Sequence, residues 1–421
     1  MPLALRTQDI ALSSYDRDCL DGRWGSATAR AMQFVVQTAK ALQARRLIDV
    51  NHCHLVGPYY SGEADLTFLR RLVEDGARVR VPTTLNASSA CLAHDSPSPP
   101  CDRDAAASVV ELYRAMGCDA QLTCAPYQLP GRPMLGDTLA WAESNAVVFA
   151  NSVLGARTNK TVQYLDLCAA LTGRIPEYGL YLDDMRQPTC IIDCSALPNE
   201  TWRTPLAGEL IGLWLGQHFD TEVPLLRGLS IKPSEDYLRG LGAAAASAGA
   251  ISLFHVAGVT PEADQYPVSH LHSVQLTTEQ LHTTAAPYQG TPTQTVNAVC
   301  LGTPHYSLDQ LRALTKRMIA TDTRATIPVF VTTSRYNRDQ LHSELLAGEL
   351  ATRGVTLVVD ACSYYRGVIP NPQGTVLTDS AKWAYYGSGN LNIATVLGDL
   401  NDCLATASSG HLQRLGDSPW L

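Results

Sequence analysis

Residues 141–159, WAESNAVVFANSVLGARTN, place many polar side chains around two apolar runs. A segment this apolar is expected to be buried, where an unpaired polar group costs about 1–3 kcal/mol. One interpretation is an internal hydrogen-bond network that fixes two loops. The other is the floor of an active site that holds a small anion, with Arg157 as the fork that binds a carboxylate through two parallel hydrogen bonds. The polar residues are Glu143, Ser144, Asn145, Asn151, Ser152, Arg157, Thr158 and Asn159.

Three cysteines lie near the ends of predicted strands, where thiolates can bind an iron–sulfur cluster. Cys124 and Cys362 each lie in a loop of small residues, and Cys300 is a possible third ligand. Spacing alone does not favour a cluster over ordinary buried thiols. His52 and His54, two residues apart, give only weak spacing for a metal site, and one packed and one solvated histidine is the simpler interpretation.

A lysine among apolar residues is a further candidate for chemistry. Lys382 follows Asp379 and Ser380 and is flanked by Ala381 and Trp383. Partial desolvation would lower the pKa of the lysine, so that it could act on a proton or an anion. An ordinary salt bridge is the alternative.

Composition narrows the classes of function. The chain has 421 residues, a net charge of −8 and no lysine- or arginine-rich block, which disfavours nucleic-acid binding. No GxGxxG, P-loop or GxSxG motif occurs, so a Rossmann dinucleotide site, a nucleotide P-loop and the common hydrolase elbow are not supported. Its 12 cysteines are spread over a large chain without an apparent signal peptide. We therefore expect a cytoplasmic protein with reduced thiols and no membrane span.

Short apolar strands alternate with helices along the chain, which predicts an α/β fold with mostly parallel sheets. Helices are predicted at 14–46, 63–74, 104–116, 166–172, 204–215, 233–248 and 308–319. Strands are predicted at 47–50, 78–82, 189–194, 251–256, 297–302, 328–332 and 356–359. The length predicts two or three lobes, with 259–288 as the best candidate for a connection between lobes. Polar clusters follow several of these strands, where α/β proteins place their sites.

Seven segments together resemble the aconitase X family over about residues 16–410. They are VRVPTTLN (79–86), TCAPYQLP (123–130), residues 141–159, ALTGRIPEYGLYLDDMR (170–186), ISLFHVAGVTPEA (251–263), LGTPHYSLDQL (301–311) and LTDSAKWAYYG (377–387). The resemblance implies a multi-lobed aconitase-like catalytic core that extends over the whole chain, 1–421.

The resemblance also implies dehydration of a small hydroxy acid. Relatives convert cis-3-hydroxy-L-proline to pyrroline-2-carboxylate, or dehydrate a phosphorylated mevalonate. Such a reaction needs a base, an acid for the leaving oxygen and a clamp for the carboxylate. On this basis Glu143, Ser380 and Lys382 are the predicted catalytic residues. The predicted substrate-binding residues are His54, Thr84, Asn86, Ser144, Asn145, Arg157, Thr158 and Asn159.

The chain departs from the family pattern in two respects. Cys124 and Cys362 match two cysteines of the family's iron–sulfur site, but Thr303 occupies the cysteine position of the Gly-Cys-Pro-His motif. Cys300, three residues earlier, is a doubtful substitute, so an altered cluster, another metal ion and no metal all remain open. Many relatives also carry a swivelling domain, fused or as a small subunit, for which the chain leaves no room. A small partner subunit, a stand-alone enzyme for another carboxylate and a non-enzymatic binding subunit are the alternatives.

Overall fold

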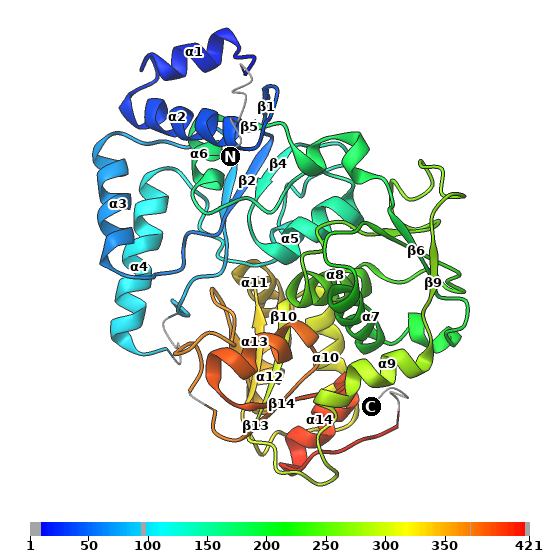
Figure 1. Cartoon of the computed structure of the whole chain (residues 1–421). Helices are drawn as coiled ribbons and strands as arrows, with labels where there is room; N and C mark the ends of the chain where they lie inside the picture. Colours follow the sequence, from blue (N-terminus) through cyan, green and yellow to red (C-terminus); the bar gives the residue numbers. More distant parts are fainter. Residues whose placement is uncertain (1–9, 94–97, 371, 417–421) are drawn as a thin grey trace.

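The computed structural model describes residues 10–93, 98–370 and 372–416, which form three lobes, each with a parallel sheet (Figure 1). The first lobe, blue to cyan-green, has the sheet order β3-β2-β4, and the second, green, has β8-β7-β6-β9. The third, yellow to red, has β12-β11-β10-β13-β14. The predicted α/β fold with short, mostly parallel sheets is confirmed.

The first lobe contains helices α1 to α6 and strands β1 to β5. Its parallel strands are β2 (His52–Leu55), β3 (Thr83–Leu85) and β4 (Leu139–Trp141), and β1 (Leu47–Asp49) pairs antiparallel with β5 (Arg174–Pro176). Its helices are α1 (Ser14–Leu20), α2 (Ser26–Ala41), α3 (Glu63–Glu74), α4 (Pro100–Ala115), α5 (Ser144–Phe149) and α6 (Leu165–Thr172).

The second lobe surrounds a pair of closely packed helices. Its strands are β6 (Cys190–Asp193), β7 (Pro224–Arg227), β8 (His255–Val256) and β9 (Ser273–Gln275), and its helices are α7 (Pro205–His218), α8 (Glu235–Ala248) and α9 (Thr278–Ala285). Gly212 lies so close to α8 that an added Cβ would stand 2.1 Å from the carbonyl oxygen of Leu241. Glycine is therefore required there, because any side chain would push the two helices apart.

The third lobe has the largest sheet. Its strands are β10 (Ala298–Tyr306), β11 (Val329–Thr333), β12 (Val355–Val358), β13 (Thr375–Thr378) and β14 (Ala394–Leu397). Its helices are α10 (Leu308–Ala320), α11 (Arg335–Ser343), α12 (Leu346–Thr352), α13 (Ala381–Leu391) and α14 (Leu400–Ser409). Every residue of β10 is buried, as expected for the middle strand of a parallel sheet.

Several predicted boundaries differ from the structure. The helix predicted over 14–46 is interrupted between α1 and α2, where Gly22 and Gly25 have φ of 77° and 95°. The strand predicted at 78–82 forms later, as β3. The strand predicted to stop at Gly302 continues through a cis Thr303–Pro304 bond to Tyr306, with an irregular register to β11.

The predicted inter-lobe connection, 259–288, consists largely of ordered elements. It includes β9, which pairs with β6, and α9, which packs on α7. The chain enters the third sheet only at β10. Among the described residues, no helix combines the length and apolar character needed to cross a bilayer.

Candidate active site

The carboxyl ends of adjacent parallel strands bring together side chains from the first lobe. His54 lies on β2, Asn86 directly follows β3, and Glu143 lies two residues after β4. Since β2 pairs with both β3 and β4, these three residues share one edge of the sheet. The Asn86 amide donates to Glu143 Oε2 at 3.1 Å. The first lobe thus presents a carboxylate whose position is fixed from a neighbouring strand.

The third lobe supplies the opposite charge. Lys382 lies in the first turn of α13, which follows β13, and its Nζ donates to Glu143 Oε1 at 2.6 Å. The Lys382 side chain is 2% exposed and that of Glu143 is 12% exposed. Asn145 Nδ2 donates to the same Oε1 at 2.7 Å and to the Cys124 carbonyl at 3.0 Å. The site therefore holds a buried, hydrogen-bonded ion pair between two lobes.

The ion pair determines the charge of both partners. Burial raises the pKa of Glu143, but the charge and hydrogen bond of Lys382 and the Asn145 amide outweigh it and lower this pKa to about 2. Burial lowers the pKa of Lys382, but Glu143 and the thiols of Cys124 and Cys362 outweigh that effect and raise it. The lowered lysine pKa predicted from the sequence is therefore wrong, since desolvation is overcome by a carboxylate in direct contact. At neutral pH the pair is carboxylate and ammonium.

Two thiols and an imidazole form a second group beside this pair. The ligand atoms of Cys124, His305 and Cys362 all lie within 4.8 Å of one another, and all three residues are buried. The backbone N–H of His305 donates to Cys124 Sγ at 3.3 Å. Burial raises the pKa of Cys124, but hydrogen bonding to Cys362 and the nearby His305 and Lys382 lower it to about 6. Cys124 is thus predisposed to be a thiolate, the form that binds metals.

A cluster held by three cysteines does not fit this set of donors. Cys300, the doubtful third ligand, is not in the group; its thiol interacts with Ser363, and burial raises its pKa. Thr303 has a neutral hydroxyl, and its Oγ1 is buried without a hydrogen-bond partner among the described residues. The usual ligands of iron–sulfur clusters are thiolates and, in Rieske centres, imidazoles, so a neutral alcohol is a poor substitute for the third cysteine. The side chains present are two thiols and one imidazole, and His305 is the ligand candidate that the sequence reasoning did not select.

Ser380 has its hydroxyl engaged by the protein. Its Oγ donates to the carbonyl of Thr303 and accepts the N–H of Trp383 at 3.1 Å, which caps α13. Glu209 Oε2 also accepts the Ala381 N–H at 2.9 Å. These contacts fix the first turn of α13 and therefore position Lys382. A catalytic role for Ser380 stays a prediction.

Much of the 141–159 segment forms internal hydrogen bonds. The Thr158 N–H donates to Asn151 Oδ1 at 3.0 Å, and Asn159 Oδ1 accepts the N–H of Leu180 at 2.8 Å. Arg186, buried and missed from the sequence, donates to Asn151 Oδ1 at 3.1 Å and to both carboxylate oxygens of Glu262. Glu143 and Asn145 are thus the members of the segment that reach the ion pair, and the network interpretation describes the part around Asn151.

Other predicted substrate-binding residues lie apart from the ion pair or have protein partners. Arg157 donates to the Tyr181 carbonyl at 2.9 Å and forms an ion pair with the exposed Asp183. Ser144 begins α5. His54 Nδ1 contacts Thr84 Oγ1 at 2.8 Å.

The free nitrogen of His54 remains available for a ligand. Its Nε2 is buried and makes no well-formed hydrogen bond among the residues described, and the Asn86 side chain lies near enough to oppose the lowering of the His54 pKa. Burial and the nearby His52 lower the pKa of His54 to about 3, so its ring is neutral at physiological pH. A neutral imidazole with one unpaired nitrogen can bind a polar substrate group.

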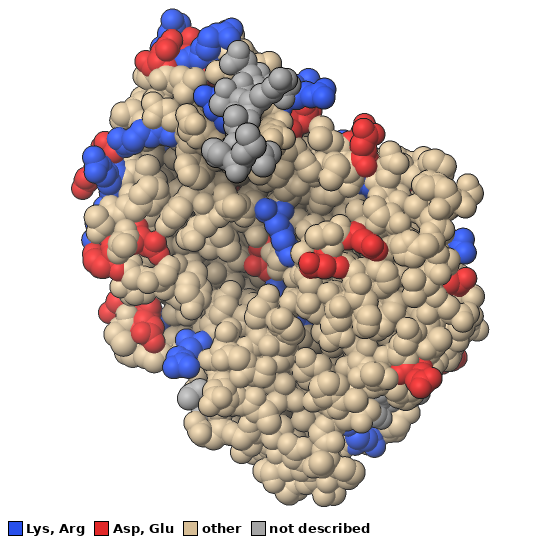
Figure 2. Space-filling view, viewed as in Figure 1, with Lys and Arg blue, Asp and Glu red and all other residues tan. Residues whose placement is uncertain are grey.

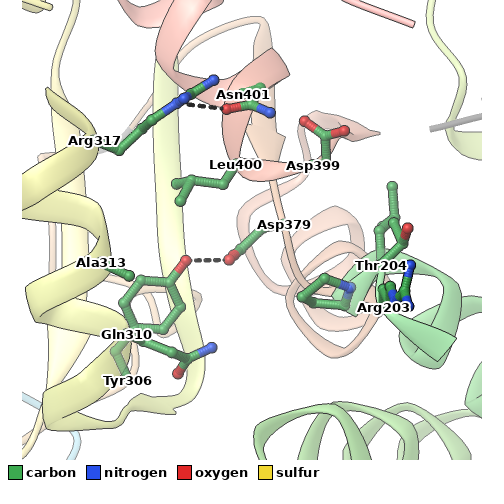
Figure 3. A pocket seen from close by; sticks show the side chains of 12 residues that line it. Arg203, Thr204, Tyr306, Gln310, Ala313, Arg317, Asp379, Asp399, Leu400 and Asn401 are labelled. Atoms are coloured by element: carbon green, nitrogen blue, oxygen red, sulfur yellow. Dashed lines mark hydrogen bonds between the residues drawn. The ribbon is translucent and has the colours of Figure 1, made fainter. Parts of the chain in front are cut away.

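The surface carries a separate pocket away from this pair. It has a volume of about 480 Å³ and lies between α7, α10 and α14. Figure 3 shows the Tyr306 hydroxyl directed at Asp379 inside it, with Arg317 and Asn401 at its far side. Neither Glu143 nor Lys382 lines this pocket. Figure 2 shows another hollow near the centre of its face, where acidic and basic side chains gather.

Comparisons with known proteins match all three lobes. The families described as Aconitase X first, second and third domain match residues 9–184, 188–286 and 296–409. The cis-3-hydroxy-L-proline dehydratase of Hypocrea jecorina is 34% identical over 96% of this chain and 69% of its own length. That of Pseudomonas aeruginosa is 34% identical over 95% of this chain and 70% of its own length.

Two further matches come from one archaeon. The phosphomevalonate dehydratase large subunit of Thermococcus kodakarensis is 32% identical over 87% of this chain and 92% of its own length. The crystal structure of Thermococcus kodakaraensis aconitase X in its holo-form superposes with a TM-score of 0.85 at 30% identity, over 94% of this chain and all of that one.

Proposed function

The chain belongs to the aconitase X family, and from that premise we propose that it is a hydro-lyase that removes water from a small hydroxy acid. Its first candidate substrate is cis-3-hydroxy-L-proline, on which the dehydratases of Hypocrea jecorina and Pseudomonas aeruginosa act by name. The observation that carries the proposal is the buried contact between Glu143 and Lys382. A carboxylate and an ammonium side by side can remove one proton and deliver another.

The elimination breaks two bonds on adjacent carbon atoms. Glu143 accepts the proton from the carbon next to the substrate carboxylate, and the electron pair of that C–H bond forms the new double bond. The C–O bond of the hydroxyl breaks, and Lys382 donates a proton to the departing oxygen, which leaves as water. Lys382 carries its proton at neutral pH, but contact with Glu143 raises its pKa and makes it a weak acid; separation of the two side chains lowers this pKa and makes Lys382 a better proton donor.

Glu143 becomes a stronger base when the substrate separates it from Lys382. At a pKa of about 2, with Lys382 in contact, the carboxylate is a weak base. A substrate whose leaving hydroxyl accepts a hydrogen bond from the Lys382 ammonium draws it away from Glu143 and raises the pKa of Glu143. The unpaired Nε2 of the neutral His54 would bind another polar group of the substrate. Substrate binding then activates the base.

The thiols of Cys124 and Cys362, with His305, suit one borderline-soft metal ion better than a three-cysteine cluster. Such an ion, when bound, would polarise the leaving hydroxyl. The protein's own part is to keep the three ligands buried and the Cys124 thiol readily ionised. No proton transfer assigned to Glu143 or Lys382 depends on the identity of this ion.

A phosphorylated mevalonate is the second candidate substrate. The chain spans 92% of the Thermococcus kodakarensis large subunit but 69% and 70% of the two hydroxyproline dehydratases. The name large subunit implies a small partner for that relative, and we propose that a small subunit in the role of a swivelling domain also works with this chain. A stand-alone enzyme for another small carboxylate is expected to act without that subunit.

The test is turnover by the purified chain, alone and with a candidate small subunit. Each substrate is incubated with wild-type protein, Glu143→Gln and Lys382→Met, and the product is identified by NMR. Lys316→Met is the matched control, because Lys316 is exposed. We expect loss of product with the first two variants and not with the control. Saturable binding by the wild type without product in any mixture would support a binding subunit instead.

A further inference from the structure

A second group of metal-type ligands lies in the second lobe and shares no residue with the site described above. The ligand atoms of Cys190, Glu222 and His272 all lie within 4.8 Å of one another. Cys190 is buried, Glu222 is partly buried and His272 is exposed. A thiol, a carboxylate and an imidazole whose ligand atoms lie this close together can bind a metal ion.

The sheet itself places these residues together. Cys190 is the first residue of β6, Glu222 precedes β7 by two residues, and His272 immediately precedes β9. Since β6 lies between β7 and β9, the three residues lie at the amino-terminal edge of three neighbouring strands.

Backbone hydrogen bonds fix this edge on both sides of Cys190. The Thr189 N–H donates to the Val223 carbonyl at 2.9 Å, and the Ile191 N–H donates to the His272 carbonyl at 2.9 Å. The two neighbours of Cys190 are therefore hydrogen-bonded to Val223, which is adjacent to Glu222, and to His272 itself. The backbone of the ligand set is ordered before any ion binds, which lowers the entropic cost of binding.

The carboxylate of the set is only partly satisfied by the protein. Glu222 Oε2 is buried and has no hydrogen-bond partner within the described part of the chain. The Cys190 thiol is hydrogen-bonded to the Glu222 carboxylate, so a bound cation would take the place of the thiol proton between them. A buried carboxylate oxygen without a donor is costly, and a thiol beside it adds no positive charge. A cation would satisfy both groups.

We propose that Cys190, Glu222 and His272 bind one zinc-type divalent cation. The sulfur and nitrogen ligands favour zinc over calcium or magnesium, which prefer oxygen. Three protein ligands leave a fourth tetrahedral position, and the exposure of His272 opens that position to water. The ion would join the beginnings of β6, β7 and β9, so its first effect is to stabilise the second lobe.

The test separates this site from the Cys124, His305 and Cys362 group. Metal-free protein is titrated with Co²⁺, whose thiolate charge-transfer and d–d absorption report a four-coordinate site. His272→Ala removes one ligand from an exposed position, and His270→Ala is the matched control because His270 is also exposed. We expect His272→Ala to bind one cobalt equivalent fewer than the wild type at the same free metal, and His270→Ala to bind as much as the wild type.

A second measurement uses stability in place of spectroscopy. Zinc that binds only the folded protein raises its melting temperature. We expect added zinc to raise the melting temperature of wild type and His270→Ala more than that of His272→Ala and Glu222→Gln. Equal cobalt stoichiometry and equal zinc shifts in wild type, His272→Ala and Glu222→Gln would overturn the proposal. Neither readout depends on dehydratase activity, so failure here is distinct from failure of the proposed function.

Discussion

Glu143 Oε1 and Lys382 Nζ lie 2.6 Å apart, although 239 positions separate the two residues in the sequence. One belongs to the first lobe and the other to the third, so the contact joins two sheets that have no strand in common. Both side chains are mostly buried. Removing one partner of such a pair leaves a buried charge uncompensated, whereas removing both does not.

Stability should therefore depend on the pair as a unit. Lys382→Met is expected to lower the free energy of unfolding by about 3–5 kcal/mol, because it leaves the Glu143 carboxylate buried alone. Glu143→Gln/Lys382→Met should lose less than Lys382→Met alone. Urea unfolding of the four proteins of this double-mutant cycle measures the coupling. Additive losses would show that the two charges do not interact across the lobes.

The pH dependence of stability should carry the signature of Glu143. Its pKa of about 2 in the folded protein lies below the ordinary 4.5, so its contribution is fully present above pH 4.5 and is lost as the pH falls from 4.5 towards 2. Glu143→Gln/Lys382→Met lacks this carboxylate. The urea midpoint of the double variant should fall less than that of the wild type between pH 5 and about pH 3. Identical pH profiles would contradict the depressed pKa.

Arg157 can be tested as a carboxylate fork separately from its ion pair with Asp183. A lost hydrogen bond to a charged group is worth about 1.5–3 kcal/mol, so Arg157→Ala should raise the KM about 10- to 150-fold. Asp183→Asn removes only a pair whose acid is 75% exposed, and such surface pairs are worth at most about 1 kcal/mol. Steady-state kinetics of both variants measure the two KM values. Equal effects of the two would assign Arg157 a structural role through Asp183.

Thr303 allows a test of the metal chemistry. Thr303→Cys restores the cysteine that the family motif has at this position, two residues before His305. We expect the variant, purified without oxygen, to retain more iron and acid-labile sulfide per chain than the wild type, because a third thiolate completes the usual donor set. The matched control is Thr332→Cys, another buried threonine in the same sheet. Equal iron and sulfide in all three proteins would show that residue 303 does not limit cluster binding.

The sequence predicted the local features of the fold better than its register. The helix predicted at 63–74 is α3, because leucines at helical spacing form one buried face. The break predicted at Thr303-Pro304 was wrong, because a proline can lie in a strand where the hydrogen-bond ladder is irregular. The interruption between α1 and α2 depends on glycines with positive φ. The sequence shows these glycines but does not show which of them adopt a positive φ and end a helix.

The candidate site was predictable in its residue types but not in its contacts. Glu143 and Lys382 were separate candidates, and no local pattern pairs residues from different lobes. The salt bridge raises the Lys382 pKa and thereby reverses the direction predicted from its apolar neighbours. Buried Arg186 donates hydrogen bonds to Asn151 and Glu262, and both partners lie far from it in the sequence. Tertiary contacts of this kind determine charge states, and single-sequence reasoning does not reach them.

The glycine at the α7–α8 contact has a genetic consequence. Glu209, one turn before Gly212 on α7, accepts the Ala381 N–H next to Lys382, so the position of α7 is transmitted to the ammonium group. An allele that replaces Gly212 with alanine would leave every proton-transferring side chain intact and still displace one of them. In a screen for inactive alleles, such a mutation would therefore be grouped with those that destroy the chemistry, although Gly212 has no side chain that could transfer a proton.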